Sequence, residues 1–345
     1  MKKILITGVA GFIGYHLAKQ LLIESSNKDV LVVGIDNMND SYDINLKKDR
    51  LKALLVLNNF RFIKDDVSNK KVILEIIVQY KIDLIVNLAA RAGVRNSISD
   101  PEPYFESNIH GFCNILEACK ESKGNKVCEK YEGVKHLIYA SSSSVYGKEK
   151  RIPFKEEFQT DKPISVYAAT KKCNEILAYS YSKLFDIPCT GLRFFTVYGP
   201  LGRPDMAYYE FTNRMIEGKN INLFNYGNMY RDFTYVDDVV KAIQLIIQKE
   251  PKRQSDGTRY KIYNIGNGSP KTLKDFVCIL EECLEEEKIL TTKCKRNYIP
   301  MQQGDVYQTY ADVNELVNDF SFRPSVSLRD GLRKFVRWYK DYYFL

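Results

Sequence analysis

The sequence has few residues of the kinds that build metal sites and membrane spans. It contains three histidines, and none of its eight cysteines belongs to a Cys-x-x-Cys pair, so we expect no metal site. No run of about 18 apolar residues occurs, and we therefore expect no membrane-spanning helix and no membrane partner. Cysteines without such pairs are typical of reduced thiols, which predicts a cytoplasmic protein.

The chain also lacks a strong excess of charge of either sign. The chain has 51 Lys and Arg against 43 Asp and Glu, a formal net charge of +8. Both signs occur in runs such as 47–50 and 281–288, which we interpret as solvated helix faces. A nucleic-acid-binding surface normally needs a strongly basic stripe, so we expect no nucleic-acid partner.

The composition is that of a globular chain. The 345 residues are 45% hydrophobic and 27% charged, which is typical of one large or two small domains. Lys2 and Lys3 precede an apolar stretch and imitate an export signal, but Gly8, Gly11 and Gly14 interrupt that stretch. We therefore interpret the N-terminus as a strand and a turn.

Apolar strand signals alternate with amphipathic helix signals through the first 200 residues. Because these strands are apolar throughout, they are typical of a parallel sheet that helices cover on both faces. Short right-handed crossovers then give an α/β fold with a doubly wound parallel sheet. The expected strands are 4–7, 30–35, 60–64, 84–87, 136–140 and 190–194, and the expected helices are 12–24, 72–80, 104–120 and one that begins near Val166.

The pattern changes after residue 199, where Gly, Asn and Tyr become frequent and strands become short. We predict one domain over 1–199 and a smaller mixed C-terminal region over 200–235 and 258–345. Segment 236–265, with a strand at 260–265, is expected to return to the first domain. No linker separates the two regions, so we expect them to pack closely and to form one cleft.

A glycine-rich turn joins the first expected strand to the first expected helix. Glycines there permit a tight turn and let the backbone approach a pyrophosphate at the helix N-terminus. The order of strand, glycine turn and helix makes dinucleotide binding a better prediction than the turn alone would. The predicted contacts are Gly8, Gly11, Phe12, Ile13 and Gly14.

Asp36 ends the second expected strand, about 20 residues beyond the glycine turn. Its carboxylate can accept both hydroxyls of an adenosine ribose and would repel a 2′-phosphate. Asn37 follows where an arginine would suit NADP, so we predict NAD as the cofactor. Asp66 and Val67, after the third strand, either address the adenine edge or form an exposed turn.

Tyr167 and Lys171 lie four residues apart, and hence on one face of an expected helix. The ammonium and a cationic nicotinamide favour phenolate, so that Tyr167 can act as a general base. The serine run 141–144 follows the fifth strand, where its hydroxyls would line the cleft at the carboxyl edge of the sheet. Tyr167, Lys171 and the serine run occur together with the glycine turn and Asp36, and chance is a poor explanation for this combination.

With these motifs the chain resembles the extended short-chain dehydrogenases/reductases, in particular the nucleotide-sugar epimerases of the UDP-glucuronate 4-epimerase type. The resemblance covers nearly the full length. Its most specific segments are 88–95, 141–147, 193–200, 202–207 and 231–238. Asn87, Arg91 and Asn96 depart from the histidine, glutamine and tyrosine that are usual in the family.

The resemblance implies that NAD serves an isomerase, which converts UDP-glucuronate to UDP-galacturonate through a 4-keto intermediate, for polysaccharide biosynthesis. It implies a NAD-binding Rossmann domain over 1–199 and a UDP-sugar-binding region over 200–235 and 258–345. A homodimer with a helical interface near 108–120 and 167–185 is a further implication.

The resemblance also assigns roles to single residues. Tyr167 would take the C4 hydroxyl proton, Lys171 would hold the nicotinamide ribose, and Ser142 would hydrogen-bond the C4 oxygen. Ser143 and Ser144 would lie near the sugar. The implied cofactor contacts are Ala89, Ala90, Arg91 and Asn108, with Phe194 beside the nicotinamide.

On the substrate side, Arg203 would bind the C6 carboxylate through its bidentate fork, or else pair with Asp205 as a loop residue. Arg95 would bind substrate or cap a helix. The other implied contacts are Thr196 for the sugar, Arg231 and Gln302 for the diphosphate, and Asp305 for the uridine ribose.

Other functions stay open at this point. UDP-glucose or UDP-N-acetylglucosamine could be the epimerised sugar, and a UDP-glucuronate decarboxylase would share the C4 oxidation. A 4,6-dehydratase is disfavoured, because Ser142 and Ser143 stand where that enzyme has an Asp-Glu pair. A non-catalytic nucleotide-binding protein is the alternative from a different class.

Overall fold

The computed structural model describes residues 1–24, 29–124, 131–302 and 304–344. Cys128 lies outside the described residues, and the other seven cysteines are free thiols. Within the described ranges, no helix is both long and apolar enough to cross a membrane.

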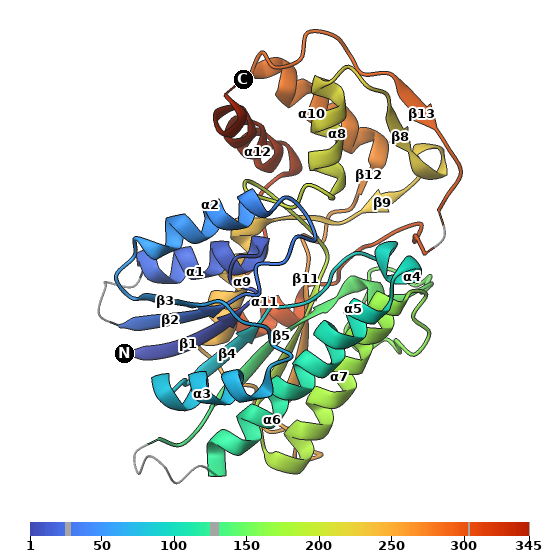
Figure 1. Ribbon diagram of the computed structural model, residues 1–345. Coiled ribbons are helices and arrows are strands. Elements are labelled where there is room, and N and C mark those ends of the chain that lie inside the picture. The colour runs from blue at the N-terminus through green and yellow to red at the C-terminus, as the bar shows by residue number, and fades with distance from the viewer. Residues whose placement is uncertain (25–28, 125–130, 303, 345) are drawn as a thin grey trace.

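Seven parallel strands form the central sheet, in the order β11-β6-β5-β4-β1-β2-β3 (Figure 1). The chain begins at β1, winds outward to β3 and then crosses to β4, which confirms the predicted doubly wound fold. The crevice between the carboxyl ends of β1 and β4 is therefore the expected ligand site. The strands are β1 (Lys2–Thr7), β2 (Val30–Ile35), β3 (Phe60–Ile63), β4 (Leu84–Asn87), β5 (His136–Ser142), β6 (Cys189–Phe194) and β11 (Tyr260–Ile265).

Alternate residues of the strands point into two separate hydrophobic cores. Ile4 and Ile6 of β1 belong to one core, and Leu5 belongs to the other. All three side chains are fully buried, because a sheet covered on both faces exposes neither side of a strand.

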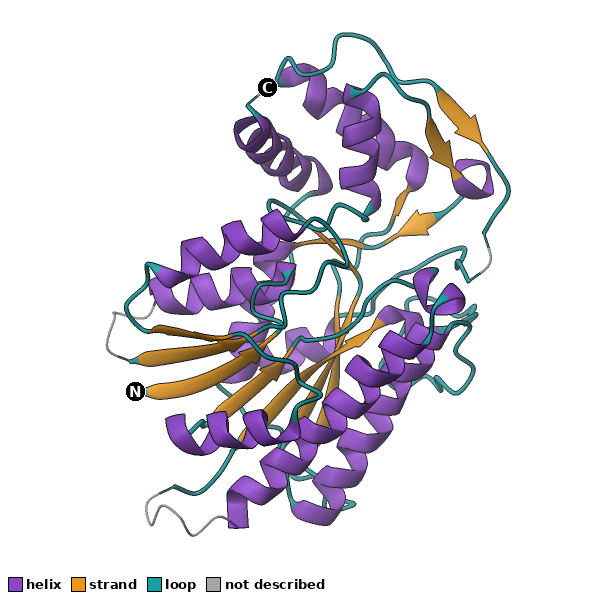
Figure 2. Ribbon diagram, in the orientation of Figure 1, coloured by secondary structure: helices purple, strands orange, loops and turns teal. Residues whose placement is uncertain are grey.

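Helices cover both faces of the sheet (Figure 2). On one face α1 packs against α2 and α9, and on the other α6 packs against α3 and α7. The two layers hold the strand ends rigidly, which lets the loops after them carry the site. The helices are α1 (Phe12–Glu24), α2 (Ile44–Leu55), α9 (Val236–Ile247) and α11 (Asn314–Phe320) on the first face, and α3 (Lys70–Tyr80), α6 (Gly111–Gly124) and α7 (Val166–Phe185) on the second.

A smaller region of short elements stands beyond the carboxyl edge of the sheet (Figure 1). Its strands form two-stranded pairs, β12 with β9 and β13 with β8, while β10 pairs with β7. Its elements are α8 (Ala207–Ile216), β8 (Ile221–Leu223), η3 (Phe224–Gly227), β9 (Tyr230–Arg231), β12 (Lys271–Thr272), α10 (Leu273–Glu286), β13 (Arg296–Tyr298) and α12 (Leu328–Tyr343), and β7 (Thr196–Tyr198) and β10 (Phe233–Tyr235) connect it to the sheet.

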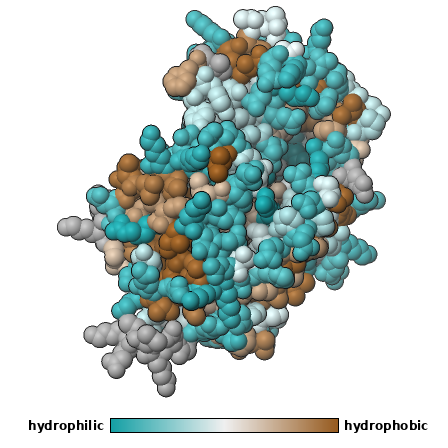
Figure 3. Space-filling model, viewed as in Figure 1, coloured by the Kyte–Doolittle hydropathy of each residue, from teal (hydrophilic) through white to brown (hydrophobic). Residues whose placement is uncertain are grey.

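The face of the molecule that carries the helices α2 and α7 is mostly hydrophilic (Figure 3). An apolar area on that face lies over α2, which ends at the exposed residues Leu55 and Val56.

Candidate functional site

The glycine turn follows β1 and leads directly into α1. Gly8 has a φ of +65°, and a methyl group on Gly14 would lie 2.3 Å from the carbonyl oxygen of Gly8. Side chains are therefore excluded at both positions, and the backbone N–H groups that open α1 face the crevice without obstruction. Behind the turn, Thr7 donates a hydrogen bond to Asn87 (2.6 Å) and accepts one from Ala89 N (3.0 Å), which joins β1 to the end of β4.

Asp36 lies directly beyond β2, and its carboxylate is buried beside the glycine turn. One oxygen accepts a hydrogen bond from Ala10 N (3.1 Å), and the other accepts one from Met38 N (2.8 Å). The ammonium of Lys47 lies 3.5 Å from the latter oxygen. Burial lowers the pKa of Lys47, although the charge of Asp36 acts in the opposite direction. The carboxylate is thus held in the position predicted for a ribose contact.

The interpretation of two charged runs as solvated helix faces is wrong at three positions. Lys47 is 5% exposed, Arg50 is 0% exposed and Glu281 is 2% exposed. Lys47 pairs with Asp36, and Glu281 forms an ion pair with Arg296. A hydropathy pattern assigns charged side chains to the surface, but Lys47 and Glu281 find ion-pair partners within about 15 residues, and Arg50 binds carbonyls about 150 residues away.

Asn37 and Asp66 contact each other across the ends of β2 and β3. Asn37 Nδ2 donates to the Asp66 carboxylate (2.5 Å), which also accepts from Ser68 N (2.8 Å). Burial raises the pKa of Asp66, but the hydrogen bonds from Ser68 and Asn37 leave that pKa below its usual value. Val67 beside it is buried.

Asn108 holds the turn of residues 89–91 that follows β4. Its side chain accepts from Arg91 N (2.8 Å) and donates to Arg91 O (3.0 Å) and to Thr170 Oγ1 (3.0 Å) on α7. The helix predicted over 104–120 is in fact broken, because α5 (Glu102–Tyr104) and a π-helical turn, η1 (Phe105–His110), precede α6. Such wide turns are frequent at functional sites. Here the wide turn carries Asn108.

The predicted catalytic residues lie together at the carboxyl edge of the sheet. Ser165 caps the start of α7 by accepting from Ala168 N (3.1 Å), and Tyr167 and Lys171 follow on one helix face. The Lys171 ammonium donates to the carbonyl of Ala140 in β5 (3.0 Å) and lies 6.0 Å from the centre of the Tyr167 ring. Burial lowers the pKa of Lys171 to about 8.

The phenol of Tyr167 is influenced by Ser142 and Arg203. Burial raises its pKa above the usual value, while a hydrogen bond with Ser142 and the positive charge of Arg203 act in the opposite direction. The structure thus brings Ser142, at the end of β5, and Arg203, on the loop before α8, to the same phenol.

The other serines of the run are held by local bonds. Ser142 caps η2 (Ser143–Tyr146) by accepting from Ser144 N (3.1 Å) and also donates to Ser144 Oγ (3.2 Å). Ser141 donates to Glu175 on α7 (2.7 Å), and Glu175 forms a buried ion pair with Arg193 of β6 (2.8 Å). These contacts fix the spacing between β5, β6 and α7, and therefore that between the serines and Tyr167.

Arg193 is followed along the chain by two further predicted site residues. Phe194 ends β6 half-buried, and Thr196 begins β7, also half-buried. Both lie at the carboxyl edge of the sheet, where Phe194 was predicted to border the nicotinamide and Thr196 to contact the sugar.

Two guanidinium groups surround Asp305. Arg95 forms an ion pair with it (3.1 Å) and stacks on the Phe224 ring at 4.6 Å. Burial lowers the pKa of Arg231 to about 10, although the negative charge of Asp305 acts to raise that pKa. Arg95 stands at the start of α4 (Asn96–Ser99), but its side chain makes no capping bond. Gln302 Oε1 is buried without a partner among the described residues. Two cations against one carboxylate leave a net positive site.

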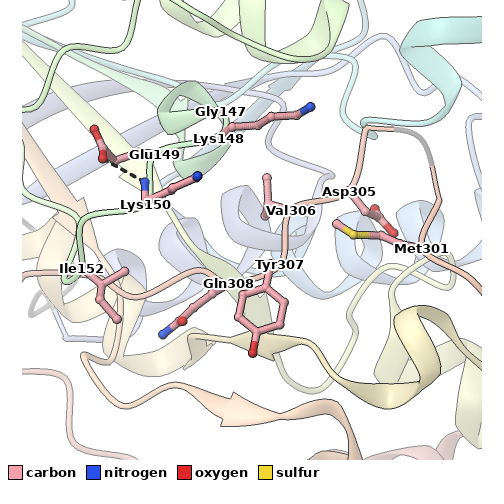
Figure 4. A pocket seen from close by; sticks show the side chains of 10 residues that line it. All are labelled: Gly147, Lys148, Glu149, Lys150, Ile152, Met301, Asp305, Val306, Tyr307 and Gln308. Carbon is pink, nitrogen blue, oxygen red and sulfur yellow. Dashed lines mark hydrogen bonds between the residues drawn. The ribbon is translucent and has the colours of Figure 1, made fainter.

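A cavity of about 480 Å³ opens beside Asp305 (Figure 4). Two segments line it, one with Gly147, Lys148, Glu149, Lys150 and Ile152 and the other with Met301, Asp305, Val306, Tyr307 and Gln308. Lys148 and Lys150 bring positive charge to its wall, and Glu149 and Asp305 bring negative charge. The volume is within the range of small-molecule sites.

Arg203 forms a two-point contact with Asp205, from Nε to Oδ1 (3.0 Å) and from Nη2 to Oδ2 (2.5 Å). The pairing that the sequence allowed as an alternative is therefore present. The same guanidinium also acts on the Tyr167 phenol, so it lies at the catalytic cluster as well.

Several supporting residues could not be recognised in the sequence. Arg50 and His16 contact the loop that carries Arg203, and Glu175 contacts the serine run. Glu175 had a usable signal, since it continues the four-residue spacing of Tyr167 and Lys171 along one helix face. Arg50 and His16 had none, because their partners in the Arg203 loop are backbone carbonyls about 150 or more residues away.

Comparisons with known proteins give the family. Residues 4–266 match a family that is described as "NAD dependent epimerase/dehydratase family". Protein CapI of Staphylococcus aureus is 46% identical over 352 residues, which cover 99% of each chain. UDP-glucuronate 4-epimerase 2 of Arabidopsis thaliana is 39% identical over 350 residues, covering 99% of this chain and 76% of the relative.

A solved structure agrees with these relatives. The UDP-glucuronic acid 4-epimerase of Bacillus cereus, solved in complex with UDP-glucuronic acid and NAD, superposes with a TM-score of 0.86 at 33% identity, covering 99% of this chain and 100% of that one. The predicted resemblance is confirmed: the chain belongs to the NAD-dependent epimerase/dehydratase family.

Proposed function

We propose that the protein is a NAD-dependent 4-epimerase whose substrate is UDP-glucuronate. The cofactor site fits NAD on two grounds. Side chains at Gly8 and Gly14 would collide with the backbone, so the turn packs tightly and places the N-terminus of α1, where a pyrophosphate binds, directly after β1. The buried carboxylate of Asp36 suits two ribose hydroxyls and repels a 2′-phosphate.

NAD, when bound, would supply the hydride acceptor and donor for C4. Tyr167 takes the C4 hydroxyl proton and gives it back after the sugar has turned. Ser142, which is hydrogen-bonded to the phenol, holds the C4 oxygen beside it for the proton transfer. The ammonium of Lys171, anchored on Ala140 O, orients the cofactor's ribose beside the phenol.

The positive site around Asp305 fits the UDP part of the substrate. Arg95 and Arg231 outnumber the carboxylate of Asp305, and in the adjoining cavity Lys148 and Lys150 face solvent-filled space beside Glu149. Guanidinium and ammonium groups are the usual partners of a diphosphate. The unpartnered oxygen of Gln302 is a free acceptor at the same place.

One observation carries the choice of a uronate, namely the position of Arg203. Its charge acts on the phenol that receives the C4 proton. The C6 carboxylate is two bonds from C4 through C5 and therefore lies close to any group at C4. Arg203 uses Nε and Nη2 for Asp205, so Nη1 has no partner among the described residues. A uronate carboxylate would share the guanidinium with Asp205 or replace it.

We expect Arg203→Ala to lower kcat/KM for UDP-glucuronate by about 10²-fold or more, because two charge-assisted bonds of about 1.5–3 kcal/mol each are lost at about 1.36 kcal/mol per decade. UDP-glucose, which has no carboxylate, should be affected far less. Arg203→Lys should restore only part of the loss, since an ammonium lacks the planar fork. Asp205→Asn should lower KM for UDP-glucuronate by removing a competing carboxylate.

The measurement is kcat/KM for both sugars in each variant. Arg253→Ala is the matched control, since Arg253 is an exposed arginine that pairs with Asp186. Equal losses on the two sugars would make Arg203 a structural loop residue and would remove the reason for choosing a uronate.

The homodimer and the cytoplasmic location stay predictions. The exposed side chains of Ile176, Tyr179 and Leu184 on α7 support the predicted helical interface. The molar mass in solution, measured by light scattering, tests it.

A further inference from the structure

Three successive carbonyls of the loop that carries Arg203 are bound by side chains of the cofactor-binding half. Pro200 O lies 2.9 Å from Nε2 of His16 on α1. Leu201 O accepts from Nε (3.1 Å) and Nη2 (2.8 Å) of Arg50 on α2, and Gly202 O accepts from Nη2 of the same arginine (3.1 Å). Arg203 is the next residue along the chain.

Arg50 uses every donor that a guanidinium has. Besides its bonds to the loop, Nη1 donates to Ala10 O (2.9 Å) and to the hydroxyl of Tyr42 (2.7 Å). The side chain is fully buried and has no carboxylate partner among the described residues. A buried cation is costly unless its N–H groups are all satisfied, and here four oxygen atoms satisfy all five. This arrangement is specific to the planar fork of arginine.

The loop adopts a backbone conformation that needs such support. Leu201 has a φ of +52°, in the left-handed region that a branched side chain rarely occupies. Its carbonyl, turned inward by that conformation, receives two of the Arg50 N–H groups. A methyl group on Gly202 would lie 1.7 Å from the Tyr208 hydroxyl oxygen, so the loop packs directly against this tyrosine and has no room for a side chain at residue 202.

His16 adds a neutral bond to the same loop. Burial lowers the pKa of its ring to about 4, although the contact with Pro200 acts in the opposite direction. The ring is therefore neutral at ordinary pH, and because a carbonyl can only accept, Nε2 carries the hydrogen. This contact persists over the whole pH range in which Arg203 could bind a carboxylate.

Ala10 links these contacts to the cofactor site. Its N–H donates to the carboxylate of Asp36, and its carbonyl accepts from Arg50. The glycine turn and the Arg203 loop are thus tied to one guanidinium, although they lie about 190 residues apart in the sequence.

We propose that Arg50, assisted by His16, is a positioning residue that fixes Arg203 beside Tyr167 and joins the sugar-recognition loop to the NAD-binding turn. The proposal rests on the role of Arg203 in the proposed function. It makes uronate selectivity depend on a residue that touches neither ligand.

The test compares Arg50→Lys with the unchanged holoenzyme, in the presence and in the absence of Arg203→Ala. We expect Arg50→Lys to raise KM for UDP-glucuronate by about 10-fold, since an ammonium cannot reach four acceptors. The calorimetric Kd for UDP, which lacks the sugar, should stay within about twofold. In the Arg203→Ala background the same change should add nothing, because coupled residues are not additive.

Two further variants keep the test decisive if Arg50→Lys does not fold. His16→Leu should raise KM for UDP-glucuronate several-fold, and His16→Gln, which keeps a donor, should restore it. Lys52→Ala, at an exposed lysine of the same helix, is the control and should change nothing. NAD content and the thermal melt are measured for each variant.

The two proposals fail in different ways. Should Arg203→Ala alone spare UDP-glucuronate turnover, the proposed uronate recognition is wrong. The positioning proposal alone is overturned if Arg203→Ala has its expected effect but Arg50→Lys weakens the binding of UDP and of UDP-glucuronate equally. It is also overturned if the loss caused by Arg50→Lys adds to the loss caused by Arg203→Ala. In either case Arg50 is a structural residue.

Discussion

At the scale of single residues, burial acts on the two ionisable groups of the catalytic pair in opposite directions. It raises the pKa of the Tyr167 phenol and lowers the pKa of the Lys171 ammonium to about 8. Both shifts favour the neutral forms. The hydrogen bond with Ser142 and the positive charge of Arg203 oppose the effect of burial on the phenol, but its pKa stays above the usual value.

Tyr167→Phe should keep the fold and the bound NAD but lower kcat by about 10²–10⁴-fold, because the same proton carrier serves both half-reactions. Tyr179→Phe is the matched control, since Tyr179 lies on the same helix but bonds Asp256 at the surface. Turnover, thermal melts and NAD content are the measurements. Near-normal epimerisation by Tyr167→Phe would assign the base to another residue.

At the scale of elements, the segment after Phe154 is joined to the edge strand β11 through a half-buried carboxyl. Glu156 accepts a hydrogen bond from Asn264 N (2.8 Å), and burial raises its pKa to about 7. In the unfolded chain this pKa is near 4.5. The folded protein therefore holds a proton on Glu156 that the unfolded chain releases between these two pH values, so this group's contribution to stability falls as pH rises from about 4.5 to about 7.

Glu156→Gln should stabilise the protein above pH 7 and leave it unchanged near pH 4.5. The gain at pH 8 is expected to be at most about 3 kcal/mol, from about 1.36 kcal/mol per pKa unit. Urea unfolding at pH 5 and pH 8 measures it, with Glu157→Gln at the exposed neighbour as control. An equal effect at both pH values would show that the carboxyl is ionised throughout.

The sequence predicted the strands better than the helices that carry function. β2 and β4 begin and end where the apolar runs do, because a strand buried on both faces leaves a continuous signal. The π-helical turn at Asn108 had no such signal, since contacts with Arg91 and Thr170 in distant segments produce it.

The predicted site residues were found from motifs, but their supports were not. Gly8, Asp36, Tyr167 and Lys171 follow local spacings that chemistry requires. Arg50 was interpreted as solvated because hydropathy assigns charge to the surface, whereas its five N–H groups bind oxygen atoms that only the folded chain brings together.

At the scale of the whole molecule, the doubly wound sheet and the smaller C-terminal region each supply half of the site. The sheet edge carries the glycine turn, Ser142 and Tyr167, and the C-terminal region carries Arg231 and Asp305. The chain returns to the sheet at β11 after forming part of that region, which ties the two halves together. A reaction that oxidises and then reduces the same carbon needs such a closed site, because the intermediate must stay bound while it turns.

The most direct test is to incubate the purified protein, with no cofactor added, with UDP-glucuronate and to separate the C4 epimers. We expect UDP-galacturonate to form until equilibrium, NAD to stay with the protein, and neither carbon dioxide nor reduced cofactor to accumulate. Release of carbon dioxide would identify a decarboxylase instead. No conversion of UDP-glucuronate by protein that carries NAD would contradict the account.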